Sequence, residues 1–238
     1  MDLLKKVLAA RDTSPAPHFA VFDFDGTVIV NDCAEAALAY MVRHAYPGAR
    51  NDFGLYYSLL DSHETSAAYR FGAQTLRKLT PRAVDAIVRS AMEEEGTEIG
   101  TAELLGRTIA KGIRLRENVV RLMRQLQTEK VDAWIVSASP ELVVRSAMDY
   151  FGLGAKAIGV RNILDEDIIT GDSLEPLSIY EGKVACIQRY IHPTAKPLLG
   201  IGDSMNDFAM LAYAQVRAVV DRGNRLAETA REHDWHLL

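Results

Sequence analysis

Four short segments of this sequence carry side chains that could do chemistry together. They are Asp23-Phe24-Asp25-Gly26-Thr27, Ser137-Ala138-Ser139, Lys183, and Gly202-Asp203-Ser204-Met205-Asn206-Asp207. Three of them follow directly after a run of apolar residues, and the lysine lies at the start of an expected helix. Several carboxylates in one crevice repel each other unless a hard cation lies among them, for which Mg²⁺ is the usual choice. The combination predicts a magnesium site.

Phosphoryl transfer is the reaction that these side chains fit. Asp23 and Asp25 are two residues apart in an expected strand, so both side chains project to the same face. One carboxylate can attack phosphorus to form an aspartyl phosphate, while the other protonates the leaving alkoxide and later takes a proton from water. Ser137 and Lys183 would hold the non-bridging oxygens, and Gly26 lets the backbone turn with its N–H groups toward them.

Taken singly, most of these residues have a structural explanation. A serine at a strand end commonly caps backbone groups, and a lone lysine commonly lies in solvent. The segment 202–207 alone would also fit a turn or a calcium loop, although it lacks the Gly and the later Glu of an EF-hand. The order and spacing of the four segments favour the functional interpretation.

The elements that must position these residues alternate between strand and helix over the second half of the chain. Helices are expected between the strands, and a small hairpin is expected to turn at Asp165-Glu166-Asp167. The expected strands are 18–24, 131–136, 157–160, 197–201 and 216–220. This alternation predicts a parallel sheet covered by helices on both faces, with ligands at the carboxyl ends of the strands.

The block from 32 to 112 has a different pattern, because it shows helical spacing and no strand pattern. One helix is marked by the apolar positions Ala34, Ala37, Leu38, Met41 and Val42. Thr80-Pro81 is a second helix start, with an N-cap residue followed by proline at the first helical position. We therefore expect a core formed by residues 1–31 and 113–238, with 1–17 as an N-terminal arm, and an all-helical insert over 32–112.

Length and composition are those of a globular protein. The 238 residues include 48% hydrophobic and 25% charged residues, and the formal net charge is −5, which argues against a general nucleic-acid binder. No window approaches the roughly 18 apolar residues of a membrane span, and the N-terminus does not resemble a signal peptide. Cys33 and Cys186 form no CxxC pair. We expect a cytoplasmic protein with no nucleic-acid or membrane partner, either a monomer or a homodimer.

In this order, the four segments resemble the haloacid dehalogenase-like superfamily, whose phosphatases carry DxDx(T/V), then Ser or Thr, then Lys, then an acidic pair. The resemblance implies a Rossmann-like three-layer α/β core, with a helical cap of type I (C1) inserted after the first motif. ITGD at 169–172, Gly182-Lys183 and GDSMND at 202–207 are similar to the phosphoserine phosphatase group. The acid at position 25 favours phosphate-ester chemistry, because dehalogenases and phosphonate-cleaving members lack it.

By position, the resemblance implies a role for each residue of the site. Asp23 would be the nucleophile and a Mg²⁺ ligand, and Asp25 the general acid and base, with its backbone carbonyl on the metal. Asp203 would be the remaining carboxylate ligand. Asn206 and Asp207 would lie behind the metal ligands, with Asp207 placed to pair with Lys183. Phosphate would be bound by Ser137, Ala138, Lys183 and Gly26.

Substrate selectivity is expected from the insert. The phosphoserine enzymes place a Glu nine residues after the nucleophile to meet the substrate amine, and Asp32 occupies that position here. Their cap arginine, which binds the serine carboxylate, has its nearest counterpart in Arg70. Without such an arginine, Asp32 would favour a cationic substrate that lacks a carboxylate, and Tyr56, Tyr57 and Tyr69 could face the cation. A small phosphorylated metabolite is expected, of the phosphoserine, phosphoethanolamine or phosphocholine type.

Two other kinds of function remain open at this point. A phosphomutase of the same superfamily would return the phosphoryl group to the substrate, giving a product isomer and no free phosphate. A non-enzymatic phospho-acceptor, such as a response-regulator receiver, also combines acids, a hydroxyl and a lysine, yet its lysine follows the acids and its chain is about half as long. An inactive binding protein is disfavoured, because every expected catalytic position holds a competent residue.

Overall fold

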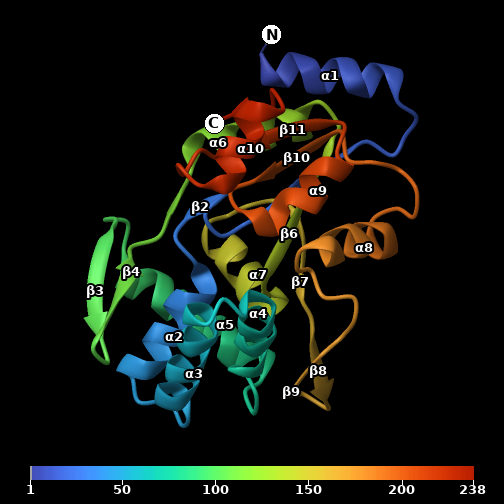
Figure 1. Cartoon of the computed structure of the whole chain (residues 1–238). Coiled ribbons are helices and arrows are strands. Elements are labelled where there is room, and N and C mark those ends of the chain that lie inside the picture. The colour runs from blue at the N-terminus through green and yellow to red at the C-terminus, as the bar shows by residue number, and fades with distance from the viewer. Residues whose placement is uncertain (1) are drawn as a thin grey trace.

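The computed structural model describes residues 2–238, and a six-stranded parallel sheet lies at its centre (Figure 1). In spatial order its strands are β12 (His236–Leu237), β11 (Val216–Val219), β10 (Leu199–Gly202), β1 (Phe19–Phe22), β6 (Asp132–Pro140) and β7 (Lys156–Val160). Every neighbouring pair runs parallel, which confirms the expected sheet. The apolar runs predict five of these strands, whereas β12 is too short to give a pattern.

Helices cover both faces of this sheet. They are α1 (Leu3–Thr13), α6 (Glu117–Thr128), α7 (Glu141–Tyr150), α8 (Glu181–Tyr190), α9 (Phe208–Tyr213) and α10 (Arg225–Glu232), with the short 3₁₀ helix η1 (Met205–Asp207). Ala20 and Phe22 of β1 belong to the large hydrophobic cluster that also contains side chains of α1, α6 and α7. Phe19 and Val21 pack instead with residues of α8 and α9. Because alternate side chains of β1 are buried on opposite faces, the strand is apolar throughout.

Two short antiparallel strands, β2 (Ile29–Val30) and β5 (Arg114–Leu115), lie where the chain leaves the sheet layer and returns to it. Between them, a layer of helices lies below the sheet in the view of Figure 1. These helices are α2 (Cys33–Arg43), α3 (Ala49–Asp61), α4 (Thr65–Gln74) and α5 (Pro81–Glu95). Thr80 caps α5, accepting a hydrogen bond from the Ala83 amide at 3.1 Å, and Pro81 is its first residue, which confirms the expected helix start.

A β-hairpin in the same segment corrects the expectation of an all-helical insert. It consists of β3 (Gly100–Leu104) and β4 (Arg107–Lys111). Leu105 and Gly106 form its turn with φ values of 52° and 79°, as a two-residue hairpin loop requires. Among the residues of its two strands, only Ile109 is buried. Since the other strand positions are at least partly exposed, the hairpin leaves no apolar alternation that sequence patterning could detect.

A second hairpin, β8 (Asn162–Asp165) and β9 (Ile168–Ser173), follows β7 and turns at Asp165-Glu166-Asp167, as expected. It reaches the helical layer, because the backbone of Ile169 exchanges hydrogen bonds with Lys78 and Leu79 at 2.8 and 2.9 Å. The hairpin therefore joins the sheet layer to the helical layer. Within residues 2–238, no helix combines the length and the apolar character that crossing a membrane requires.

Candidate active site

The carboxyl end of β1 delivers Asp23 to the floor of a cavity. The side chain is buried; its Oδ1 accepts a hydrogen bond from Lys183 at 2.7 Å and its Oδ2 accepts one from the Thr27 hydroxyl at 3.0 Å. Burial, and the neighbouring charge of Asp207, raise the pKa of Asp23 well above its usual value. A cation bound beside Asp23 would therefore stabilise its ionised carboxylate.

Lys183 projects from the first turn of α8 and is fully buried between two carboxylates. Its Nζ lies 2.7 Å from Asp23 and 2.5 Å from Asp207. Burial lowers the pKa of Lys183, but the charges of the two carboxylates outweigh burial and raise it overall. The expected pairing of Lys183 with Asp207 is therefore present. Lys183 reaches Asp23 from behind and is not one of the residues that line the cavity.

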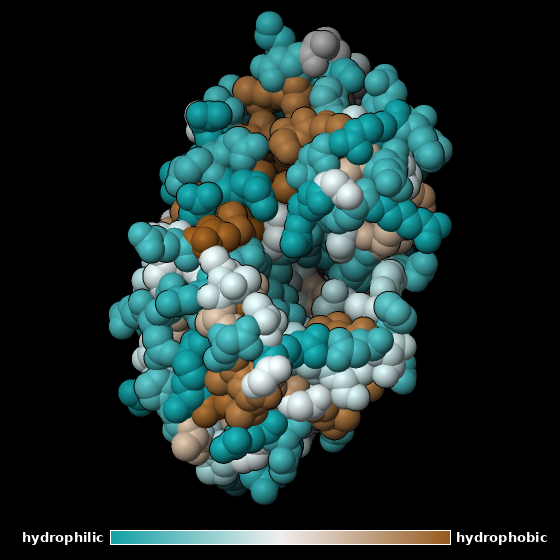
Figure 2. Space-filling model, turned by 60° about the vertical axis from the view of Figure 1, so that its left-hand side comes forward, coloured by the Kyte–Doolittle hydropathy of each residue, from teal (hydrophilic) through white to brown (hydrophobic). Residues whose placement is uncertain are grey.

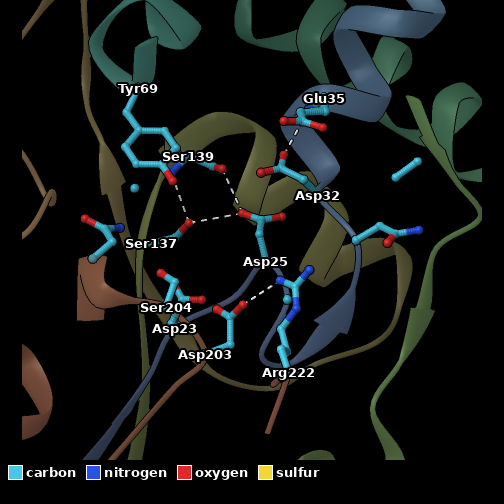
Figure 3. A pocket seen from close by; sticks show the side chains of 15 residues that line it. Asp23, Asp25, Asp32, Glu35, Tyr69, Ser137, Ser139, Asp203, Ser204 and Arg222 are labelled. Atoms are coloured by element: carbon cyan, nitrogen blue, oxygen red, sulfur yellow. Dashed lines mark hydrogen bonds and ion pairs between the residues drawn. The ribbon is translucent and has the colours of Figure 1, made fainter. Parts of the chain in front are cut away.

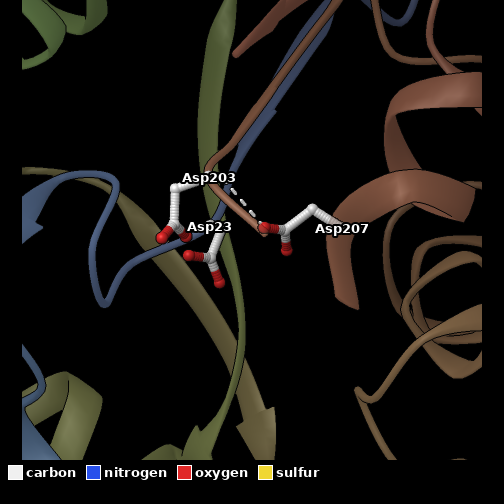
Figure 4. Close-up of side chains that lie close together, drawn as sticks. All are labelled: Asp23, Asp203 and Asp207. Atoms are coloured by element: carbon white, nitrogen blue, oxygen red, sulfur yellow. Dashed lines mark hydrogen bonds between the residues drawn. The ribbon is translucent and has the colours of Figure 1, made fainter. Parts of the chain in front are cut away.

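Three carboxylates meet where β1 and β10 end side by side (Figure 4). One oxygen each of Asp23, Asp203 and Asp207 lies within 4.8 Å of the others. Both oxygens of Asp207 are engaged, because Oδ1 binds Lys183 and Oδ2 accepts the backbone amides of Asp203 and Ser204 at 3.0 and 3.1 Å. Asp23 and Asp203 line the cavity, whereas Asp207 does not, and their hard, closely spaced oxygens fit a divalent cation such as Mg²⁺.

Asp25 points away from this group of three carboxylates, toward the end of β6 (Figure 3). Its Oδ2 accepts hydrogen bonds from Ser139 at 2.7 Å and Ser137 at 3.3 Å, and its Oδ1 accepts the backbone amide of Cys33 at 2.7 Å. The Asp25 carboxylate is therefore separate from the carboxylates of the candidate metal ligands. Ala138 lies between the two serines and also lines the cavity.

Gly26 departs from its expected role in binding phosphate. Its N–H donates to the carbonyl of Asn31 at 3.0 Å, so it does not point at a phosphoryl group. Instead, Gly26 has φ of +76°, and a Cβ at this position would lie 2.4 Å from Asp203 Oδ2 and 2.6 Å from Arg222 Nη1. The position requires glycine because the turn is left-handed and the Asp203 side chain passes close to the backbone.

Several residues of the site have no role assigned by the sequence analysis. Thr27 donates at 3.0 Å to Asp23 and at 3.2 Å to Asp203, so one hydroxyl bridges both candidate metal ligands. Arg222 donates to Asp203 Oδ2 at 2.6 Å and lines the cavity. Its position just beyond β11, at the same edge of the sheet, is the signal that could have identified it. Glu35, in the first turn of α2, also lines the cavity.

Asn206 lines the cavity and also fixes the backbone before α8. Its side-chain oxygen accepts the backbone amide of Tyr180 at 2.7 Å, which fixes the residue immediately before α8. The side chain of Asn224 similarly donates to the backbone carbonyl of Asp203 at 2.8 Å. The first contact ties the start of α8, which carries Lys183, to η1, and the second fixes the backbone of Asp203.

The cavity has a volume of about 230 Å³ and opens between the sheet layer and the helical layer, where Figure 2 shows the surface hollowed. This volume is below the roughly 300–1,000 Å³ of drug-sized sites, so it suits a small metabolite. Asp32 lines the cavity as expected. Arg70 does not: its guanidinium is half exposed and pairs with Glu175 at 3.0 Å, outside the cavity. The expected contact of Arg70 with substrate therefore has no support in this structure.

Comparisons with known proteins agree with this architecture. A family model described as haloacid dehalogenase-like hydrolase matches residues 20–212. The structure is similar to a conserved protein of unknown function from Anaerococcus prevotii, with a TM-score of 0.74 and 23% identity over 98% of this chain and 90% of that one. It is also similar to a protein of unknown function from Bordetella pertussis, with a TM-score of 0.73 and 18% identity over 94% and 99%.

A phosphoserine phosphatase, solved as an analogue of its phospho-aspartyl intermediate, is a more distant structural neighbour. Its TM-score is 0.56, at 16% identity over 87% of each chain. A search of curated protein sequences returns no match. At such identities, the structural neighbours establish the fold.

Proposed function

Because this chain belongs to the haloacid dehalogenase-like hydrolase family, we propose that it is a Mg²⁺-dependent phosphomonoester hydrolase that acts through an aspartyl phosphate. The placement of Asp23 carries the proposal: its carboxylate lies on the cavity floor, 2.7 Å from Lys183, and a second carboxylate, Asp25, lines the same cavity. The substrate is a small phosphorylated metabolite, with amino alcohols of the phosphoserine, phosphoethanolamine or phosphocholine type as the leading class.

In the first half of the proposed reaction, a carboxylate oxygen of Asp23 bonds to phosphorus and the ester P–O bond breaks. The leaving alkoxide takes a proton from Asp25, which the hydroxyls of Ser137 and Ser139 hold in place. In the second half, Asp25 removes a proton from water, the water oxygen bonds to phosphorus, and the bond to Asp23 breaks. Phosphate is released, and both carboxyl groups return to their starting states.

The remaining residues stabilise charge. Asp23, Asp203 and the backbone carbonyl of Asp25 would hold Mg²⁺, which when bound supplies positive charge against the phosphoryl oxygens. The charge of Lys183 lowers the pKa of Asp23 against the effect of burial, and it adds positive charge behind the phosphoryl group. We assign Ser137 and Ala138 to phosphate binding on the opposite side of the cavity.

The insert would act as the cap of this site. We propose a core of residues 1–31 and 113–238 that carries the catalytic side chains, and a cap of residues 32–112 that closes over them. Asp32, Glu35, Tyr69 and Ala110 from the insert line the same cavity as Asp23, so the cap forms the far wall of the site. Such a wall excludes water from the aspartyl phosphate and contacts the alcohol part of the ester.

A phosphate-release screen tests the proposal. Purified protein is incubated with phosphoserine, phosphoethanolamine, phosphocholine, sugar phosphates, nucleotides and p-nitrophenyl phosphate, with Mg²⁺ or with EDTA. Release that requires Mg²⁺ and is lost in Asp23→Asn supports the proposal. Release that persists in the pure variant would exclude the covalent mechanism. A product isomer without free phosphate would identify a phosphomutase instead.

A further inference from the structure

The two ends of the cavity differ in chemistry. The floor carries the phosphoryl-transfer residues at the sheet edge, and the far wall is formed by the insert (Figure 3). On that wall, Asp32 is the N-cap residue of α2 and Glu35 lies in its first turn, and both side chains line the cavity. Tyr69, from α4, lines the same cavity on the side of Ser137 and Ser139, across from these two carboxylates in Figure 3. The insert therefore contributes two carboxylates and an aromatic ring to the cavity.

The Asp32 carboxylate has one oxygen left for a ligand. Its Oδ1 caps α2, accepting the backbone amides of Ala34 at 2.8 Å and Glu35 at 2.9 Å, and its Oδ2 makes no hydrogen bond within the described chain. Burial, followed by the charges of Asp25 and Glu35, raises the pKa of Asp32 well above its usual value. A cation that enters the cavity would therefore stabilise the ionised form of Asp32.

Glu35 is fixed in place by two phenol groups. Its oxygens accept hydrogen bonds from Tyr57 at 3.1 Å and Tyr56 at 3.4 Å, and burial raises the pKa of Glu35. The guanidinium of Arg107 lies 4.3 Å from the centre of the Tyr57 ring, where its charge partly offsets that of Glu35, and it is paired with Asp61. Within residues 2–238, neither Asp32 nor Glu35 has a basic side chain within ion-pair distance.

The single cationic side chain that lines the cavity among the described residues is Arg222, and it lies on the floor, bound to Asp203 at 2.6 Å. A substrate carboxylate at the far wall would meet two acids and no arginine or lysine, and like charges brought together in this way are strongly unfavourable. An ammonium group would instead be attracted by both carboxylates and by the face of Tyr69.

From this distribution of charge we infer that the substrate is the phosphate monoester of an amino alcohol, with a cationic head group beside Asp32, Glu35 and Tyr69 and without a carboxylate. This inference rests on the proposed phosphatase function. It assigns Glu35 as a specificity-determining residue and excludes phosphoserine as the preferred ester.

Three esters of similar size test the inference. Phosphoethanolamine carries the ammonium, 2-hydroxyethyl phosphate replaces it with a neutral hydroxyl, and phosphoserine adds a carboxylate. We expect kcat/KM for phosphoethanolamine to exceed that for each of the other two by at least about 10-fold. Equal values for phosphoethanolamine and 2-hydroxyethyl phosphate, or a preference for phosphoserine, would overturn the inference and leave the phosphatase proposal intact. No Mg²⁺-dependent release from any ester, including p-nitrophenyl phosphate, would instead overturn the proposed function, and the inference with it.

Glu35→Gln removes the charge and keeps an oxygen that can accept the tyrosine hydroxyls. We expect kcat/KM for phosphoethanolamine to fall by about 10-fold, and by much less for 2-hydroxyethyl phosphate. Glu93→Gln is the matched control, because Glu93 is exposed on α5 and the same charge is removed from the insert. An equal fall for both esters in Glu35→Gln, with an unchanged melting temperature, would assign Glu35 a general role and refute its role in selecting the cation.

Discussion

Replacement of Lys183 by methionine should destabilise the protein strongly, because the ammonium of Lys183 neutralises two buried carboxylates. Nζ lies 2.7 Å from Asp23 and 2.5 Å from Asp207, and the lysine side chain is fully buried. Methionine is unbranched and flexible, so it fills the space and the loss is mainly electrostatic. Breaking a buried ion pair by removing one partner costs about 3–5 kcal/mol, and we expect a loss of this size in the free energy of unfolding near neutral pH.

The loss should become smaller as the pH falls. Burial and the charge of Asp207 already raise the pKa of Asp23 above its value in an unfolded chain, and removal of the lysine raises it further. A carboxyl with the higher pKa in the folded state binds its proton more tightly when folded. Lowering the pH toward the folded pKa therefore stabilises the folded variant relative to the unfolded chain, and part of the loss is recovered.

Urea unfolding in EDTA, at neutral pH and at about pH 5.5, measures both effects. Lys156→Met is the matched control, because Lys156 pairs with Asp132 at the same 2.7 Å but both side chains are exposed. An exposed pair contributes about 0–1 kcal/mol, so the control should change little. The double variant Lys183→Met with Asp207→Asn should recover part of the lost stability. Equal losses in the two lysine variants, or a loss in Lys183→Met that grows as the pH falls, would refute this reasoning.

Three further predictions concern the catalytic site. Asp23→Asn should lower kcat by at least about 1,000-fold, since it removes the nucleophile and keeps the shape; phosphate release measures the loss, and circular dichroism checks the fold. Gly26→Ala should lower the free energy of unfolding by about 1–2 kcal/mol and weaken Mg²⁺ binding in calorimetry, because its Cβ would lie 2.4 Å from Asp203 and its φ is +76°; unchanged Mg²⁺ affinity would contradict the close approach. Arg70→Ala should change kcat/KM by less than about 2-fold, because Arg70 pairs with Glu175 at the surface; a large loss would return Arg70 to the substrate site.

Much of the fold could be predicted because its signals are local. The buried run before Asp23 is apolar on both faces, which is typical of a central strand in a parallel sheet. Thr80-Pro81 begins a helix for reasons contained in those two residues. The hairpin β3–β4 was missed because its strands expose most of their side chains, so they carry no alternating pattern. β12 was missed because two residues cannot show periodicity.

The sequence also predicted that the functional side chains would come together at one site, because the carboxyl ends of parallel strands lie at the same edge of the sheet. Asp23 and Asp203 follow β1 and β10, Ser137 lies in the last part of the neighbouring β6, and the structure places all three around one cavity. Residue type and position along the chain were enough for this step, because the direction of every strand is fixed once the sheet is parallel.

The sequence by itself determined five of the six strands of the central sheet, the edge of that sheet at which the functional side chains gather, and the identity of the reactive groups. Only the tertiary structure decided which atoms meet: Asp25 turns toward two serines, the Gly26 amide is used by Asn31, and Arg222 rather than Arg70 enters the cavity. Helix and strand signals arise between residues a few positions apart. The partner of a buried side chain can lie 176 positions away, as for Thr27 and Asp203. Their contacts depend on strand register and helix rotation, which packing of the whole core fixes.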